Sequence, residues 1–211
     1  MRQTTKEAML ARIRGAIADA PEAPAIPADY RQRDERERSA IQEDFVDRLL
    51  DYKASVVQTE ASNLSCVIAD ACQSYRIQRL VIPSDIPSDW LPAGVTTLRD
   101  DPPLSLNEID TSDAVLTGCA SAIAQTGTII LDGGLTQGRR LLSLVPDQHL
   151  CIVRASQIVG IVPEAIVAMR ARAQQPITLI SGPSATSDIE LSRVEGVHGP
   201  RKLHVIVVRD I

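Results

Sequence analysis

Apolar residues recur at helical spacing near the start of the chain. Met9, Ile13 and Ala16 fall on one face of a helix. Thr4 and Glu7 have the spacing of a capping box at the beginning of that helix. The pattern therefore predicts a first helix that starts directly after Thr4.

A proline-containing segment separates this helix from the rest of the chain. Residues 20–28 include three prolines, which predict an extended linker rather than a continued helix. A second helix is expected next. It opens with the mixed-charge run 31–38, read as a solvated face, and carries the apolar stripe Ile41, Phe45, Leu49 and Tyr52. We therefore expect residues 1–30 to form an N-terminal helical arm, and residues 31–211 to form one α/β domain.

From residue 55 onward, short apolar runs alternate with helical stretches. The expected strands are 55–58, 80–82, 113–116, 128–131, 150–153, 177–180 and 203–208. The expected helices between them are 63–75, 139–144 and 162–173. Strands that are apolar at nearly every position are buried on both faces. Together with the interleaved helices, they predict an α/β fold with a largely parallel sheet flanked by helices.

Composition and charge narrow the class of protein. Hydrophobic residues make up 44% of the chain and charged residues 23%, as in soluble globular proteins. The net charge is −5 and aromatic residues make up only 2%, so we expect no nucleic-acid partner. The sequence has neither an apolar run long enough for a membrane span nor the apolar core of a signal peptide. We therefore expect a cytoplasmic location.

The four cysteines do not form a metal-binding pattern. Cys66, Cys72, Cys119 and Cys151 include no Cys-x-x-Cys pair, and no histidine stands at metal spacing from them. An iron–sulfur cluster usually needs several closely spaced thiolates. We expect reduced, mostly buried thiols and neither a metal nor another bound cofactor.

A glycine-rich loop after the expected strand 128–131 is the first candidate site. Its glycines let the backbone approach a ligand closely, and its arginines, at an expected helix start, suit a phosphate or carboxylate. The candidate ligand-binding residues are Gly133, Gly134, Gln137, Gly138, Arg139 and Arg140. The alternative is a flexible loop whose arginines face water, since the segment matches neither a P-loop nor a dinucleotide fingerprint.

Two further segments carry small polar residues. The run after strand 177–180 offers Ser181, Gly182, Ser184, Thr186 and Asp188 as an anion cradle. The alternative is a helix start, because Ser187 and Glu190 have capping-box spacing.

Histidine supplies the third candidate. His198 stands between two glycine turns and can act as an acid, a base or a hydrogen-bond donor. The alternative is a purely structural hydrogen bond, which we expect for His149 and His204. Since ligand sites in such folds lie beyond the carboxyl ends of strands, we expect residues 133–140, residues 181–188 and His198 to meet in one pocket at that edge.

Four blocks of sequence together resemble one known family. The segments 122–128 (AIAQTGT), 138–146 (GRRLLSLVP), 181–190 (SGPSATSDIE) and 196–205 (GVHGPRKLHV) are similar to the lactate-utilisation (LUD) domain family. Within that family the chain looks like the lactate-utilisation protein C type, and the similarity covers roughly residues 40–211. The order and spacing of the blocks make the resemblance specific.

The resemblance implies a fold and a role. The fold would be related to the superfamily of aminosugar-phosphate isomerases, ribose-phosphate isomerases and coenzyme A transferases. The role would be in oxidising L-lactate to pyruvate beside two iron–sulfur partner proteins, as the cluster-free member of that set. No catalytic residue follows from the family. One departure is Gln125, where many members carry an acidic residue, so a step that depends on this acid would be missing here.

Two kinds of function follow from these observations. The first is a cluster-free subunit or accessory factor of an L-lactate-oxidising system. The alternative is a free-standing enzyme or sensor that binds a phosphorylated, carboxylate or coenzyme A-linked small molecule. A coenzyme A transferase needs a carboxylate nucleophile, and Glu164, Glu190 and Glu195 are available for that role. The sequence leaves open whether the chain is itself catalytic.

Overall fold

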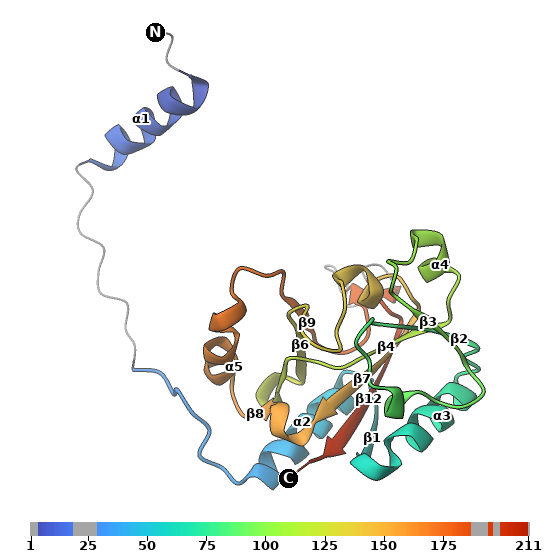
Figure 1. Cartoon of the computed structure of the whole chain (residues 1–211). Coiled ribbons are helices and arrows are strands. Elements are labelled where there is room, and N and C mark those ends of the chain that lie inside the picture. Colours follow the sequence, from blue (N-terminus) through green and yellow to red (C-terminus); the bar gives the residue numbers. More distant parts are fainter. Residues whose placement is uncertain (1–3, 19–28, 187–193, 196–198, 211) are drawn as a thin grey trace. The chain divides into compact units, whose positions relative to one another are not determined.

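The computed structural model of the chain describes residues 4–18, 29–186, 194–195 and 199–210 (Figure 1). The chain divides into two compact units, Met1–Arg31 and Gln32–Ile211. The first unit contains helix α1 (Thr5–Ile17), which begins with the expected capping box between Thr4 and Glu7. No residue of α1 is buried. Residues 20–28 lie outside the described part, and the boundary at residue 30 stays a prediction.

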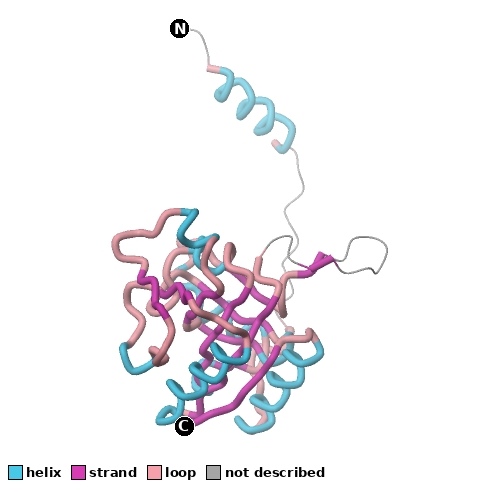
Figure 2. Tube along the Cα trace, turned by 90° about the vertical axis from the view of Figure 1, so that its right-hand side faces the viewer, coloured by secondary structure: helices cyan, strands magenta, loops and turns pink. Residues whose placement is uncertain are grey.

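The second unit is built on a six-stranded sheet in the order β1-β12-β7-β4-β2-β3 (Figure 2). All five neighbouring pairs are parallel. The strands are β1 (Ser55–Glu60), β2 (Arg79–Ile82), β3 (Thr96–Arg99), β4 (Ala114–Thr117), β7 (Gln148–Arg154) and β12 (Lys202–Arg209). This topology confirms the α/β fold with a parallel sheet flanked by helices.

Helices cover both faces of this sheet because its strands are apolar on both sides. Strand β7 shows the alternation: Leu150 and Ile152 join the cluster under helix α3 (Leu64–Ser74). Cys151 and Val153 join the opposite cluster, under helix α2 (Arg38–Asp51). Phe45 and Leu49 of α2 are fully buried in this second cluster. Ile41, Phe45 and Leu49 of the expected stripe therefore form the contact face of α2, whereas Tyr52 lies beyond the helix and is exposed.

A second, four-stranded sheet packs on the α2 side. Its order is β8-β5-β6-β9, with β5 (Ser121–Ile123), β6 (Thr128–Leu131), β8 (Ile158–Val159) and β9 (Thr178–Ile180). The sheet is mixed, since β6 runs antiparallel to β5 and β9 while β5 and β8 are parallel. Helix α5 (Val162–Met169) covers it through Ala165. The sequence pattern did not separate this sheet from the main one.

The remaining elements are short. They are helix α4 (Leu106–Asp110), strands β10 (Ala185–Thr186) and β11 (Val194–Glu195), which pair antiparallel, and six 3-10 turns, η1 to η6, within the described ranges. None of the helices among the described residues is long and apolar enough to cross a membrane.

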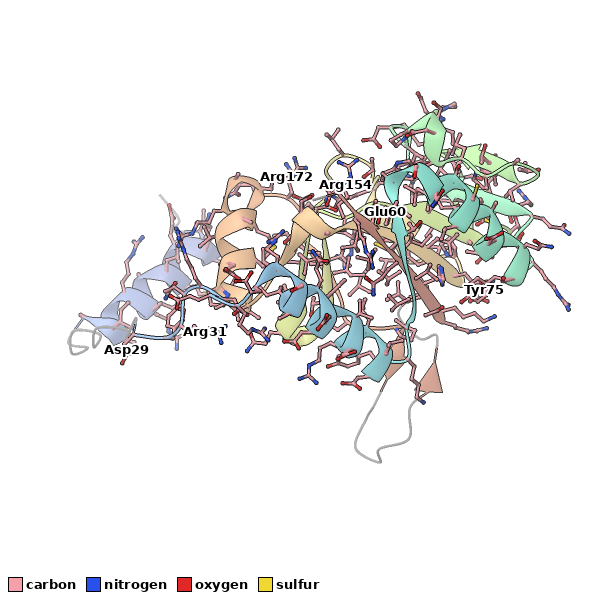
Figure 3. The ribbon with its side chains drawn as sticks, turned by 90° about the horizontal axis from the view of Figure 1, so that it is seen from below. Asp29, Arg31, Glu60, Tyr75, Arg154 and Arg172 are labelled. Carbon is pink, nitrogen blue, oxygen red and sulfur yellow. The ribbon has the colours of Figure 1, made fainter. Side chains whose placement is uncertain are left out.

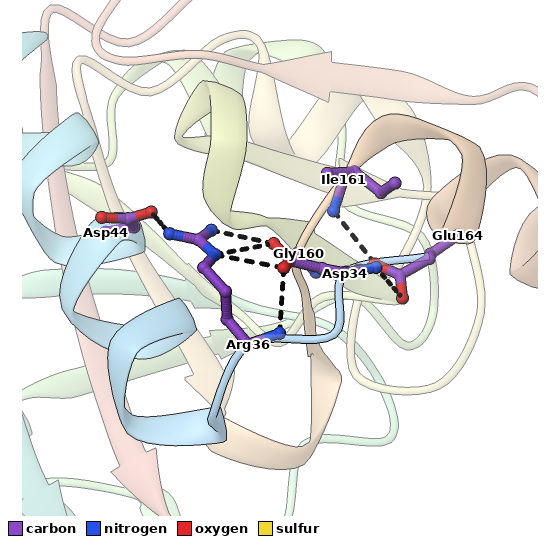
Figure 4. A network of polar contacts seen from close by, with 6 residues as sticks. All are labelled: Asp34, Arg36, Asp44, Gly160, Ile161 and Glu164. Atoms are coloured by element: carbon purple, nitrogen blue, oxygen red, sulfur yellow. Dashed lines mark hydrogen bonds and ion pairs between the residues drawn. The ribbon is translucent and has the colours of Figure 1, made fainter. Parts of the chain in front are cut away.

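The expectation that residues 31–38 open the second helix is wrong. Helix α2 begins only at Arg38, and polar contacts hold the preceding backbone extended (Figure 4). The buried carboxylate of Asp34 accepts hydrogen bonds from the side chain and backbone of Arg36. Glu164 of α5 accepts hydrogen bonds from the backbone N–H groups of Asp34, Gly160 and Ile161 at 2.9 to 3.3 Å. Asp34 and Arg36 thus connect this segment to α5 and α2. Seven of the eight residues in 31–38 are exposed, as expected for a solvated face.

Two other expected helices are shorter than the pattern predicts. Residues 139–144 form only the 3-10 turn η4 (Arg140–Ser143). Pro146 follows closely, and a proline restricts the residue before it and has no N–H to donate. The expected helix 162–173 ends as α5 at Met169, and the turn η6 (Arg170–Arg172) follows. Residue 139 therefore offers no helix N-terminus to an anion.

Candidate functional site

A cavity lined by described residues opens at the carboxyl ends of β2, β4 and β7. This carboxyl-edge cavity has a volume of about 570 Å³. One wall is formed by residues that follow these strands, and the other by the loop 132–137 with Arg172. Its position matches the general location of ligand sites in open α/β sheets. The lining residues are Asp85, Pro87, Trp90, Gly118, Cys119, Ala120, Asp132, Gly134, Leu135, Thr136, Gln137, Ile152, Arg154, Gln157 and Arg172.

Asp132 holds the loop wall of this cavity in place. It directly follows β6 and is 6% exposed. Its Oδ1 accepts hydrogen bonds from Gly134 N at 2.9 Å and from Gln137 Nε2 at 3.0 Å. Its Oδ2 lies 2.9 Å from Arg172 Nε, and Gln137 Oε1 accepts from Asp132 N at 2.7 Å. With these contacts Asp132 is a positioning residue, and neither of its oxygens is free to act as a base.

The loop also lies unusually close to the end of β4. Gly118 N donates to the carbonyl oxygen of Thr136 at 2.8 Å. A Cβ at position 118 would stand 2.1 Å from Thr136 Oγ1, so only glycine fits there. The two walls of the cavity are therefore tied together at this point.

Arg154 is the cation that this cavity leaves available. It ends β7 and lines the cavity together with Arg172. Figure 3 labels both side chains, which lie near each other. Arg172 is paired with Asp132, whereas Arg154 forms no ion pair within the described ranges. A free guanidinium at the carboxyl edge can hold a carboxylate or phosphate through two parallel hydrogen bonds.

Cys119, near Arg154, carries a buried thiol. Burial raises the pKa of its thiol well above the ordinary value, although the charge of Arg154 lowers it slightly. The thiol donates to Gln157 Oε1 at 3.5 Å, and Gln157 Nε2 donates to the Cys119 carbonyl at 2.7 Å. The protonated thiol therefore serves to fix Gln157 in the cavity wall.

A second cavity lies on the other side of the glycine-rich loop. This arginine cavity has a volume of about 370 Å³. The predicted residues on its wall are Gly133, Gln137, Gly138, Arg139 and Arg140. Gly134 lines the carboxyl-edge cavity instead, and Gln137 lines both cavities.

The two predicted arginines differ in what they contact. Arg139 Nε and Nη2 each lie 2.9 Å from a carboxylate oxygen of Asp100, so this guanidinium is already occupied. The same contact raises the Arg139 pKa. Arg140 forms no ion pair with any described residue, so Arg140 is the one that remains available for an anion.

A third cavity contains the serine-rich segment. This amino-edge cavity, of about 260 Å³, lies beside β9 and the amino ends of β7 and β12. Ser181, Gly182 and Ser184 line it, and Ser184 N donates to the Pro200 carbonyl at 2.8 Å. Residues 181–184 are therefore at the amino ends of the parallel strands, not at the carboxyl edge where we expected them.

The predicted segments do not share one cavity among those described. The arginine and amino-edge cavities adjoin, however, because Ser143 and Thr178 line both. Thr186 belongs to β10, and Asp188 and His198 lie outside the described residues. The ligand-binding role of all the predicted residues stays a prediction.

Sequence reasoning missed the features that complete the carboxyl-edge cavity. Arg154 directly follows the expected strand 150–153, so its place at a strand's carboxyl end was a usable signal. Gly118 follows the expected strand 113–116 in the same way. Nothing in the local pattern indicated Arg172, because its contact with Asp132 joins residues forty positions apart.

Other candidate residues have structural roles. Gln125 is exposed on the turn η3 (Ala124–Thr126) and lines none of the three cavities. His204 Nδ1 lies 2.9 Å from Ser55 Oγ, as expected for a structural histidine. All four cysteines are free, and Cys66 is the exposed one. Among the described residues, no group of three His, Cys, Asp or Glu side chains is placed to hold a metal ion.

These observations define an α/β protein with a cavity at the carboxyl edge of its parallel sheet. Comparison with known proteins gives the family: residues 44–208 match the LUD domain, and the chain belongs to the LUD domain family. This result confirms the resemblance found in the sequence.

Individual relatives agree with this assignment. The chain is 55% identical over 173 residues to Lactate utilization protein C of Deinococcus radiodurans, a match that covers 81% of each chain. It is 37% identical over 94 residues to the uncharacterized protein YkgG of Escherichia coli, covering 42% of this chain and 40% of that protein. A crystal structure of a DUF162 family protein from Deinococcus radiodurans superposes with a TM-score of 0.72 at 46% identity. That match covers 82% of this chain and 99% of the other.

Proposed function

We propose that the chain acts in lactate utilisation as a cluster-free component of a cytoplasmic system that oxidises L-lactate to pyruvate. The observation that carries this proposal is the 55% identity to Lactate utilization protein C over 81% of both chains. Identity at this level over most of two chains of similar extent favours a shared role over a merely shared fold.

The cysteines and the ligand cavity support the assignment. Three of the four cysteines are buried, and burial raises the pKa of Cys72 to about 11 and that of Cys151 to about 12. Thiols held protonated in this way are poor cluster ligands. Electron transfer would then belong to iron–sulfur partner proteins. This chain would contribute a small-anion site in which Arg154 holds a carboxylate.

Deletion of the encoding gene in the native host tests the proposal. We expect the deletion strain to lose growth on L-lactate as sole carbon source and to keep growth on pyruvate, the product of the proposed reaction. The intact gene should restore growth on L-lactate. Growth of the deletion strain on L-lactate at the parental rate would refute the proposed role.

The size of the carboxyl-edge cavity favours a second candidate. A volume of about 570 Å³ is in the range of sites for larger organic ligands rather than for a three-carbon acid. The chain would then be a sensor or free-standing enzyme for a larger phosphorylated or coenzyme A-linked molecule. Glu164 does not supply a transferase nucleophile, because its carboxylate already accepts three backbone N–H groups. Tighter binding of coenzyme A than of L-lactate and pyruvate, measured by calorimetry, would favour this candidate.

A further inference from the structure

His149 carries a buried hydrogen-bonding atom with no partner in the described part of the chain. The residue stands near the start of β7 and is 1% exposed. Its Nε2 lies 2.7 Å from Thr117 Oγ1. Its Nδ1 is buried and unpaired, and His149 lines the amino-edge cavity. An unpaired polar atom in such a place costs free energy unless something in the cavity pairs with it.

The neighbours of His149 determine which kind of partner Nδ1 needs. The carbonyl oxygen of Gly118 can only accept, so the Cys151 thiol, 3.8 Å away, donates to it. The Thr117 hydroxyl, 3.9 Å from Cys151 Sγ, then donates to the sulfur. Thr117 Oγ1 is left to accept the proton on His149 Nε2. In a neutral imidazole the other nitrogen carries no proton and offers a lone pair, so His149 Nδ1 is a hydrogen-bond acceptor.

Burial keeps the imidazole in this neutral form. It lowers the pKa of His149 to about 4, so the ring carries one proton at neutral pH. The group that pairs with Nδ1 must therefore bring its own O–H or N–H.

The surroundings of Nδ1 suit a small hydroxylated molecule. The amino-edge cavity, of about 260 Å³, is lined by Ser143, Thr178 and Ser181 together with apolar residues. The Ser143 hydroxyl also donates to the Arg140 carbonyl, and Ser181 Oγ lies 2.8 Å from Thr128 Oγ1. Ser143 and Thr178 also line the arginine cavity, in which Arg140 has no ion-pair partner among the described residues. A molecule with a hydroxyl group at one end and an anionic group at the other matches this pair of adjoining cavities.

We propose that the amino-edge cavity is a binding site for a small molecule whose hydroxyl group donates a hydrogen bond to His149 Nδ1. The site lies apart from the carboxyl-edge cavity and its Arg154. The class of ligand is a 2-hydroxy acid, and this choice rests on the proposed function. L-Lactate is therefore the probe, and propionate, which lacks only the 2-hydroxyl group, is the matched control ligand.

Nitrogen-15 NMR of the histidine side chains tests the proposal on the intact protein. The chain has three histidines, and His149→Phe identifies the His149 signals by their loss. We expect the His149 Nδ1 resonance to shift on addition of L-lactate and not on addition of propionate. L-Lactate should bind about three- to tenfold more tightly than propionate, as expected for one hydrogen bond.

Two variants show whether the preference for L-lactate depends on His149 itself or on the loss of any buried histidine. His149→Phe should remove the preference for L-lactate over propionate. His204→Phe, the matched control, removes the other buried histidine with an unpaired nitrogen, which does not line this cavity, and should keep the preference. If His149→Phe does not fold, Ser181→Ala takes its place and should reduce L-lactate affinity without abolishing the Nδ1 shift.

Three results would overturn the proposal. They are equal Nδ1 shifts with both acids, an unchanged preference in His149→Phe, and no L-lactate binding at all. Each can be distinguished from failure of the proposed function, which is decided by growth of the deletion strain. If the deletion strain fails to grow on L-lactate but the His149 Nδ1 resonance does not shift on addition of L-lactate, this site alone would be refuted.

Discussion

Replacement of Asp132 by alanine is the sharpest test of how the glycine-rich loop is held. The change removes the acceptor of two hydrogen bonds, from Gly134 N at 2.9 Å and Gln137 Nε2 at 3.0 Å, and the partner of Arg172. Hydrogen bonds to a charged group contribute about 1.5–3 kcal/mol, and an exposed ion pair about 0–1 kcal/mol. Arg172 is 43% exposed at its side chain, so the ion pair adds little.

Both hydrogen bonds end on the same oxygen, so their contributions do not add in full, and we expect Asp132→Ala to lower the free energy of unfolding by about 2–4 kcal/mol. Asp132→Asn keeps an oxygen acceptor for the backbone and Gln137 and loses only the charge, so it should cost about 1 kcal/mol. Arg172→Ala should also cost about 1 kcal/mol or less. The matched control is Asp147→Ala. This aspartate is 66% exposed and paired with Arg201 at 3.4 Å, and its loss should change stability by less than about 0.5 kcal/mol.

Urea denaturation measures these differences. With m near 2 kcal/mol/M, Asp132→Ala should lower the midpoint by roughly 1–2 M without changing m. An Asp132→Ala midpoint within about 0.3 M of that of Asp147→Ala would mean that the loop does not depend on this carboxylate. Our account of the cavity wall would then be wrong.

Four further results are expected. Phe45→Ala should lower the free energy of unfolding by about 3–5 kcal/mol in urea denaturation, because this ring is fully buried under α2; a loss below about 1 kcal/mol would contradict that packing. Deletion of residues 1–26 should leave one cooperative unfolding transition, and a non-cooperative product would place α1 in the core. The purified protein should be colourless, and visible absorption with stoichiometric iron would remove it from the cluster-free class. Because the folded-state pKa of His149 is about 4 and the unfolded value about 6.5, stability should fall as pH drops from 6.5 to 4. His149→Phe should show a shallower fall over that range.

The strands of the main sheet could be predicted because runs of consecutive apolar residues indicate strands that are buried on both faces. The run 203–208 is apolar at nearly every position, and the structure places it as β12, an interior strand between β1 and β7. The hairpin of β5 and β6 was not predicted as a separate sheet. Its strands are as apolar as the central ones, since both of its faces are also covered, and so no alternation marks it.

The candidate site was harder to predict, because contacts distant in sequence decide which polar residues are free. Arg139 and Arg140 are adjacent and chemically identical, yet only Arg139 meets Asp100, thirty-nine positions earlier. The serine-rich segment follows β9, a strand of the second sheet, so the rule that loops meet at the carboxyl edge of the main sheet did not apply to it. His149 was expected to be structural, and its unpaired Nδ1 is visible only in three dimensions.

The central claim is that this chain is needed for L-lactate oxidation and contributes an anion site through Arg154. The most direct measurement is the rate of L-lactate oxidation to pyruvate in extracts of the gene-deletion strain, with purified protein added back. We predict that extracts without the protein are inactive, that the native protein restores the rate, and that Arg154→Ala restores at most about a tenth of it, as the loss of one charge-assisted contact implies. Extracts that oxidise L-lactate at the parental rate without this protein would contradict the claim.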